Sequence, residues 1–191
     1  MTMVSKKRFI LSCLLVNNWF FKYLFYFILQ GHDTVATNIN FTLFLLASHP
    51  EIQQRCQEEL QTIFGDDLRP ATSKDLSSMK YLEMCIKESL RLYQSVPIIV
   101  RCLGEDIHVG NQLIPAGTNC LMLTYLLHRD PNVFANPDRF NPDRFLPENC
   151  LKRGPYDYVP FAAGPRNCMG QKFAMLEEKL MISSVLRRFN I

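Results

Sequence analysis

The chain has 191 residues, a formal net charge of +3, a hydrophobic share of 48% and a charged share of 20%. This composition predicts a folded domain with an apolar core and excludes a disordered tail. The small basic excess gives no reason to expect nucleic acid as a partner. Seven cysteines without a CxxC pair or a repeated spacing exclude a disulfide framework and a structural zinc site.

The amino-terminal segment, residues 1–30, differs from the rest of the chain. A basic cluster from Lys6 to Arg8 precedes an apolar stretch of membrane-spanning length, from Phe9 to Leu29, with a few polar interruptions. This pattern is typical of a signal anchor. The alternative hypothesis is a gene-model artefact, because the same residues could be translated from an intron ending in a pyrimidine tract. We therefore treat this segment as separate and expect the folded part in residues 31–191.

The first part of that folded region has a helical pattern. An apolar helix is expected over residues 33–47. Ser48 and Glu51 fit a capping box for a second, amphipathic helix over residues 50–63, which a glycine then ends. A polar loop over residues 66–73 and a short turn follow.

The remainder of the chain combines helices with short strands. A helix is expected over residues 79–93, and short strands over residues 98–123, with a hairpin turn at Gly110 and the following asparagine. Residues 130–160 hold six of the eleven prolines together with four asparagines and predict an ordered but irregular segment. A final helix is expected over residues 170–188. The fold class is therefore mainly α with small β-sheets.

The strongest chemical signal is the loop FAAGPRNCMG, residues 161–170, just before the final helix. Its Cys168 would face backbone N–H groups at a helix start, which stabilise a thiolate. Gly164 and Gly170 permit tight curvature and close approach of a flat ligand. Arg166 is placed to pair with an anionic group on that ligand. The alternative interpretation is a structural cysteine in a Gly/Pro-rich loop.

The spacing FxxGxRxCxG resembles the haem-binding loop of cytochrome P450 enzymes. The five defining positions are Phe161, Gly164, Arg166, Cys168 and Gly170. The resemblance implies that Cys168 is the axial thiolate ligand of the iron in haem b. It also implies that Phe161 packs beside the sulfur and that Arg166 binds a haem propionate.

A second motif of the same family is ExxR, here Glu88 and Arg91. Taken alone, a carboxylate and a guanidinium three residues apart predict an ordinary surface salt bridge. The resemblance implies instead a buried triad that holds the haem pocket, with an arginine from a PxRF sequence as its third member. PxRF occurs twice, with its arginine at Arg139 in the first copy and at Arg144 in the second. The second copy is the better placed. We therefore assign Arg144 to the triad.

The third motif is the sequence GHDT, residues 31–34. Asp33 and Thr34 favour helix N-caps, which is one interpretation. The resemblance implies that they lie in mid-helix on the distal side of the haem and are catalytic. Thr34 would then hydrogen-bond dioxygen or water, and Asp33 would help to relay protons. Arg101, at the entry to a strand, resembles the arginine of the family that reaches a haem propionate.

The motifs together resemble the family 4 type of cytochrome P450, many of which hydroxylate fatty acids. The resemblance implies a haem-thiolate monooxygenase that takes electrons from NADPH through NADPH-cytochrome P450 reductase and acts on an apolar small-molecule substrate. It implies residence at the endoplasmic reticulum membrane. The sequence resembles the carboxyl-terminal, haem-binding part of the fold and is expected to be truncated at both ends. Two alternatives stay open: an inactive fragment with weak or no haem binding, and a thiol-dependent redox protein that uses Cys168.

Overall fold

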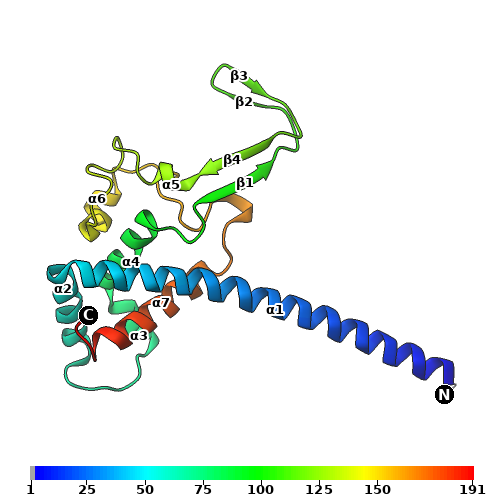
Figure 1. Cartoon of the computed structure of the whole chain (residues 1–191), viewed down its shortest axis with the longest axis horizontal. Helices are drawn as coiled ribbons and strands as arrows, with labels where there is room; N and C mark the ends of the chain where they lie inside the picture. Colours follow the sequence, from blue (N-terminus) through cyan, green and yellow to red (C-terminus); the bar gives the residue numbers. More distant parts are fainter. Residues whose placement is uncertain (1–2) are drawn as a thin grey trace.

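The structure, a computed structural model, describes residues 3–191, with side chains described from residue 19 onward. It is mainly helical and carries two small antiparallel sheets of two strands each (Figure 1). This confirms the fold class that the sequence predicts. The helices gather at one end of the molecule, where the carboxyl terminus also lies, and the sheets extend beside them (Figure 1).

The first helix, α1 (Met3–Ser48), is much longer than the predicted helix over residues 33–47. Gly31 lies inside it, because one glycine costs a helix only about 1 kcal/mol. No proline occurs before Pro50, so nothing in the preceding sequence breaks the backbone hydrogen bonds. The amino-terminal part of α1 projects beyond the rest of the chain, and its carboxyl-terminal part packs on other helices (Figure 1).

The projecting part of α1 has an unusual surface. Apart from Lys22, every residue from Trp19 to Leu29 is aromatic or aliphatic and exposed. Within the part of the chain that the structure describes, no helix reaches the length and hydropathy that a membrane crossing requires. The side chains of residues 1–18 lie outside the described residues, so both interpretations of the segment 1–30 stay predictions.

The second helix, α2 (Pro50–Phe64), begins differently from the prediction. Ser48 still belongs to α1, and its hydroxyl donates to the Phe44 carbonyl oxygen at 2.8 Å. His49 occupies the N-cap without a side-chain capping bond, so the predicted Ser48–Glu51 capping box is wrong. The predicted end at Gly65 is correct, and its φ of 58° is the left-handed conformation that glycine adopts at helix ends.

A capping box does occur at the next helix, α3 (Ser73–Ser78), in the region predicted as a loop and turn. Thr72 and Asp75 exchange hydrogen bonds between side chain and backbone, as the pattern T-x-x-D permits. Helix α4 (Lys80–Leu92) follows and matches the predicted helix over residues 79–93. Its amphipathic sequence buries one face in the core.

The two sheets contain the predicted strands. Strand β1 (Ile98–Cys102) pairs with β4 (Asn119–Leu123), and β2 (Ile107–Val109) pairs with β3 (Gln112–Ile114), both antiparallel. The inner hairpin turns at Gly110, whose φ is 58°. This confirms the hairpin that the Gly-Asn pair predicted, because such a turn needs a residue at positive φ.

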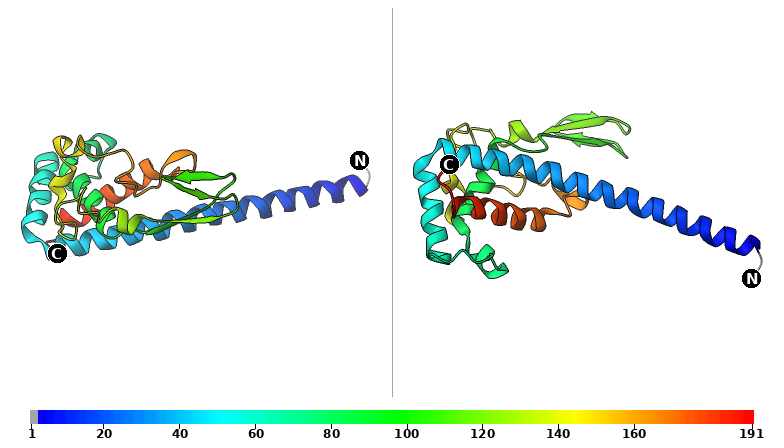
Figure 2. Two further views of the ribbon diagram at one scale, coloured as in Figure 1. Left: turned by 90° about the horizontal axis from the view of Figure 1, so that it is seen from above. Right: turned by 60° about the horizontal axis from the view of Figure 1, so that its bottom comes forward.

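After the sheets, the chain passes through short helical turns before the final long helix. These are α5 (Thr124–Leu127), the 3₁₀ turn η1 (Pro142–Phe145), α6 (Pro147–Cys150) and the 3₁₀ turn η2 (Gly164–Arg166). The prolines in this region start turns rather than long helices, as predicted. Helix α7 (Gln171–Leu186) follows and packs along the carboxyl-terminal half of α1 (Figure 2).

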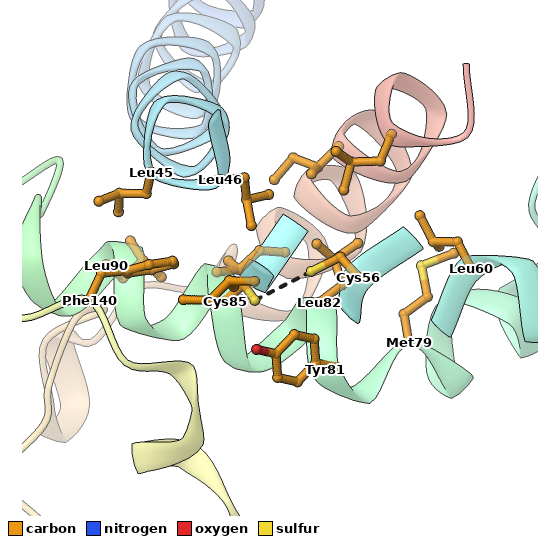
Figure 3. Packing of buried hydrophobic residues seen from close by; sticks show 14 of the residues in the cluster. Leu45, Leu46, Cys56, Leu60, Met79, Tyr81, Leu82, Cys85, Leu90 and Phe140 are labelled. Carbon is orange, nitrogen blue, oxygen red and sulfur yellow. Dashed lines mark hydrogen bonds between the residues drawn. The ribbon is translucent and has the colours of Figure 1, made fainter. Parts of the chain in front are cut away.

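The core lies where α1, α2, α4 and α7 meet (Figure 3). Leu46, Leu82 and Ile182 are fully buried there, one each from α1, α4 and α7. Two free thiols, Cys56 and Cys85, face each other across this core with their sulfurs 3.5 Å apart. Burying these apolar side chains holds the four helices together, and it fixes the positions of α1, α4 and α7, which carry or adjoin the residues of the candidate site.

Candidate functional site

The loop before α7 is tightly curved and closed on itself. The Cys168 backbone N–H donates to the Phe161 carbonyl oxygen at 2.9 Å, and the Asn167 N–H donates to the Gly164 carbonyl oxygen at 3.1 Å. Gly164 has a φ of 77°, a conformation that residues with a Cβ rarely adopt. The Phe161 side chain packs against the core cluster and so anchors the start of the loop.

Cys168 stands at the end of this loop with an exposed, free thiol. Two residues later Gly170 forms the N-cap of α7, so the first N–H groups of a 16-residue helix begin beside the cysteine. The sulfur lies 3.8 Å from the position that a Cβ on Gly170 would occupy, which is ordinary van der Waals contact. The structure therefore brings the Phe161 backbone, Cys168 and Gly170 together, and the predicted packing of the Phe161 ring beside the sulfur stays a prediction.

Glu88 and Arg91 form a buried ion pair on α4. Both side chains are fully buried, and the Arg91 Nε lies 2.7 Å from the Glu88 Oε2. A second arginine nitrogen donates to Oε1 at 2.8 Å, so the contact is bidentate. The geometry is the buried pair that the resemblance implied and differs from the surface salt bridge that spacing alone suggested.

Arg144 completes this cluster from the η1 turn. Its Nε lies 3.2 Å from the Glu88 Oε1, which also accepts the Asn141 backbone N–H at 2.9 Å. Burial lowers the pKa of Arg144. The Glu88 carboxylate opposes that shift, and the positive charge of the neighbouring Arg91 guanidinium adds to it. Arg139 contributes only its backbone carbonyl, which Arg91 contacts at 3.3 Å. The second PxRF copy therefore supplies the guanidinium.

The cluster is tied to the segment that leads into the loop. Arg91 donates to the backbone carbonyl oxygen of His128 at 2.8 Å, and the His128 Nε2 accepts the backbone N–H of Val159 at 2.9 Å. Burial, followed by the charges of Arg91 and Arg129, lowers the pKa of His128 to about 4. The ring is therefore neutral at pH 7 and can accept this bond. Val159 lies nine positions before Cys168.

Asp33 and Thr34 lie in the middle of α1, not at an N-cap. The Thr34 hydroxyl donates to the Gln30 carbonyl oxygen at 2.9 Å, and the Thr34 carbonyl oxygen accepts the Ser95 hydroxyl at 2.7 Å. Asp33 is exposed, with its Oδ1 3.2 Å from the His32 Nδ1. The segment after α4 is thus fastened to α1 at the residue for which a distal role was predicted.

A cavity of about 770 Å³ opens beside Thr34, between α1 and the segment after α4. Its lining is mainly aromatic and aliphatic and includes Tyr26, Leu29 and Val96. Thr34 and Asp33 lie at its wall. A cavity of this size and polarity suits an apolar small molecule.

The two arginines predicted to bind propionates lie on separate elements. Arg101 is on β1, and its guanidinium donates to the neighbouring Val100 carbonyl oxygen at 2.9 Å. Arg166 ends the η2 turn and is exposed. The structure records no contact between them among the described residues, and their joint role stays a prediction.

The donor set at the loop fits haem. Within the residues that the structure describes, no group of three or more His, Cys, Asp and Glu side chains could hold a metal ion. Haem iron takes a cysteine thiolate from the protein and its other ligands from the macrocycle, which the exposed Cys168 suits. The exposed thiol and the open curvature at Gly164 and Gly170 leave room for a flat group.

The comparisons with known proteins decide the family. The Cytochrome P450 family model matches residues 22–191. The chain belongs to the cytochrome P450 family. It is 58% identical over 166 residues to cytochrome P450 4c3 of Drosophila melanogaster and 52% identical over 163 residues to cytochrome P450 4V2 of Homo sapiens. These matches confirm the resemblance to family 4 of the cytochrome P450 enzymes.

The matched residues cover 86% and 85% of this chain but 31% of each of the two relatives. The chain thus spans about a third of the length of the curated cytochromes P450 that it matches. The matched length accounts for all but a minor share of the 191 residues.

Sequence reasoning missed two polar residues in the helix interface near this site. Asn38 on α1 and Glu178 on α7 are buried, at 0% and 2% exposure. Asn38 falls within the predicted apolar helix and Glu178 within the predicted final helix, so their helical spacing could have placed them on buried faces. What the sequence lacks is the pairing of the two helices, which brings the faces together.

Proposed function

We propose that this cytochrome P450 is a haem-thiolate monooxygenase that inserts one oxygen atom of O₂ into an apolar substrate such as a fatty acid. The second oxygen atom leaves as water, which requires two electrons and two protons. Haem would supply the activation of dioxygen. The electrons would come from NADPH through NADPH-cytochrome P450 reductase. The observation that carries the proposal is the exposed Cys168 thiol on a loop that a backbone bond closes at 2.9 Å.

The residues around the loop act as its supports in this proposal. Cys168 would bind the iron, and Phe161 would hold the loop on the core. The buried ion-pair cluster would hold the segment before the Cys168 loop in place without touching the reacting atoms. Its members are Glu88, Arg91 and Arg144. A buried network of this kind is hard to change, because removing one charge leaves its partners unpaired. Arg101 and Arg166 would neutralise the propionates, since guanidinium groups match carboxylates geometrically.

Thr34 and Asp33 would handle protons on the opposite side of the haem. The Thr34 hydroxyl can rotate away from the Gln30 carbonyl oxygen and donate to a ligand or water. Asp33 is exposed beside His32, so its carboxylate can exchange protons with solvent and pass them toward Thr34. The apolar wall of the open cavity that both residues border would contact the substrate.

We further propose that the protein resides at the endoplasmic reticulum membrane. The exposed aromatic and aliphatic residues from Trp19 to Leu29 and the basic cluster at Lys6 to Arg8 support association with a lipid surface, because apolar side chains enter the bilayer while cations contact the headgroups. Expression with a carboxyl-terminal fluorescent tag, followed by membrane fractionation, tests this. Recovery of the chain in the soluble fraction would contradict it.

The activity is tested by supplying haem during expression and adding NADPH, the reductase and dodecanoate. The expected result is hydroxylated dodecanoate that depends on NADPH. Thr34→Val should lower the rate about 100-fold while haem binding is kept, because a proton-transfer group typically contributes two to four orders of magnitude. Haem binding without any product, from dodecanoate or from an apolar substrate panel, would contradict the proposed activity.

A further inference from the structure

A carboxyl group interrupts the buried face of α7. Ala174, Ile182 and Leu186 lie on this face at intervals of four and eight residues and are at most 9% exposed. Glu178 occupies the remaining position of the same stripe and is 2% exposed. A carboxylate buried among apolar side chains is expensive unless it is paired or protonated.

An amide on α1 lies beside this carboxyl group. Asn38 is fully buried on α1, the helix that packs against α7. Its side chain influences the Glu178 carboxyl as a hydrogen-bond donor would. The next turn of α1 carries Thr42, whose hydroxyl is already bound to the Asn38 backbone carbonyl oxygen at 2.8 Å. The Asn38 amide and the Glu178 carboxyl are thus the polar groups left at this point of the interface.

Three buried atoms of this pair lack a hydrogen-bond partner within the described residues. They are Asn38 Oδ1, Asn38 Nδ2 and Glu178 Oε2. An ionised carboxylate could accept from Nδ2 but would leave Oδ1 unsatisfied, because a carboxylate has no donor. A protonated carboxyl group resolves this: its O–H donates to Oδ1, and its other oxygen accepts from Nδ2. Amide and carboxylic acid are complementary in this neutral form only.

The charges around Glu178 favour the neutral form. Burial raises the pKa of Glu178 to about 7, the Asn38 amide opposes the rise, and the neighbouring carboxylate of Glu177 adds to it. No cation acts on Glu178 among the described residues. Lys179, the next residue of α7, is bound instead to the Glu83 carboxylate of α4 at 2.6 Å. Burial, followed by the charge of Glu88, raises the pKa of Tyr158, and its hydroxyl donates to the Lys87 carbonyl oxygen at 2.7 Å rather than to Glu178.

We propose that Glu178 is protonated in the folded protein and forms a neutral, doubly hydrogen-bonded pair with Asn38 that holds α1 against α7. Asn38 lies one helical turn after Thr34, and Glu178 lies on the helix that follows Cys168. The pair is therefore a positioning contact between the two sides of the candidate site. This last step rests on the proposed function, whereas the pair itself does not.

Urea unfolding of the full chain at several pH values tests the pair without haem. A group whose pKa is raised by folding stabilises the protein below its unfolded pKa, near 4.5, and this contribution is lost as the pH rises through about 7. The unfolding constant of the wild type, relative to that of Glu178→Gln, should rise on the order of 50-fold between pH 5 and pH 8. Other titrating groups, His128 included, cancel in this ratio.

Glu177→Gln is the matched control, because Glu177 is the adjacent and more exposed carboxylate of the same helix. It should keep most of the pH dependence of the wild type, with a slightly smaller rise, because the Glu177 carboxylate only adds to an effect that burial of Glu178 dominates. Infrared spectroscopy supplies a readout that a purely structural role would not move: a protonated carboxyl band at pH 6 that Glu178→Gln removes. Asn38→Leu should shift this band to higher frequency, because the carbonyl loses its amide partner.

An equal pH dependence of unfolding in the wild type and in Glu178→Gln would overturn the proposal, as would a carboxyl band that Asn38→Leu leaves unshifted. Hydroxylation assays are not part of these measurements. Failure of the proposed activity with an intact pH difference would therefore refute the monooxygenase alone, and loss of the pH difference would refute the pair alone.

Discussion

Arg144 and Glu88 are 56 positions apart in the sequence, yet the arginine Nε lies 3.2 Å from the carboxylate Oε1. This contact joins the η1 turn to α4 and completes a cluster in which one carboxylate serves two guanidinium groups. His128 connects this cluster to the segment that leads to Cys168, because it bonds to Arg91 on one side and to Val159 on the other. The position of the loop therefore depends on residues that are far from the Cys168 thiol in the sequence.

Replacing the shared carboxylate should be strongly destabilising. Glu88→Gln leaves the buried guanidinium of Arg91 without its charge partner, and we expect the free energy of unfolding to fall by about 3–5 kcal/mol. Urea unfolding at pH 7 measures this. The control is Asp143→Asn, which breaks the exposed ion pair with Arg55 and should cost less than about 1 kcal/mol. Similar losses for both variants would contradict a special role of the buried cluster.

The two PxRF arginines should respond differently to the same change. Arg144→Ala removes a side chain bound to Glu88 and should lower the free energy of unfolding by about 2–3 kcal/mol. Arg139→Ala should change it by less than about 0.5 kcal/mol, because that residue enters the cluster through its backbone carbonyl. Thermal unfolding of both variants checks this. A larger loss for Arg139→Ala would mean that the first copy supplies the guanidinium.

Two glycines of the loop should also differ. Gly164 has a φ of 77°, so Gly164→Ala should destabilise the protein by about 1–2 kcal/mol. Gly170 has a φ of −86°, and its added Cβ would lie 3.8 Å from the Cys168 sulfur. Gly170→Ala should therefore leave the free energy of unfolding nearly unchanged. Chemical denaturation in the absence of haem separates this backbone effect from haem affinity, and equal losses would refute it.

His128 should make the fold sensitive to acid. Its pKa is lowered from 6.5 to about 4 by burial and by Arg91 and Arg129, so the unfolded chain binds a proton more readily than the folded one. The stabilisation is complete above pH 6.5 and is lost as the pH falls toward 4, on the order of 3 kcal/mol in all. Unfolding from pH 7 to pH 4 measures this, with His128→Gln as the comparison.

A parallel measurement on His108→Gln provides the control for His128, because His108 is exposed on the β2 strand. That variant should keep the acid sensitivity of the wild type. If His128→Gln and the wild type lose stability equally as the pH falls, the neutral ring does not hold Val159 in the way that the 2.9 Å contact indicates.

Local sequence signals predicted much of the fold. The Gly110 turn and the end of α2 at Gly65 followed from backbone conformations that glycine adopts readily. The start of α2 did not, because the Ser48 hydroxyl bonds back within α1, and competing side-chain to backbone bonds are nearly equal in energy. The sequence before Pro50 contains no strong helix stop, which is why α1 can be long. Its full length was not predicted, because the sequence also lacks the amphipathic periodicity that indicates a helix.

The candidate site was predicted through resemblance more than through residue chemistry. Spacing alone made Glu88 and Arg91 a surface pair, and only the family pattern suggested burial. Neither the spacing nor the family pattern predicted the proposed pairing of Asn38 with Glu178, because it depends on how α1 and α7 face each other. Helix pairing is set by the packing of the whole core, so a single sequence does not determine which buried polar residues meet.

The central claim is that Cys168 is the thiolate ligand of a bound haem. The most direct measurement is the Soret band of the haem-supplied chain, reduced under carbon monoxide, for the wild type, Cys168→Ala and Cys102→Ser, which alters another exposed cysteine. The account predicts the red-shifted band of thiolate ligation in the wild type and in Cys102→Ser, and its loss in Cys168→Ala. The same red-shifted band in Cys168→Ala, or no haem band in the wild type, would contradict it.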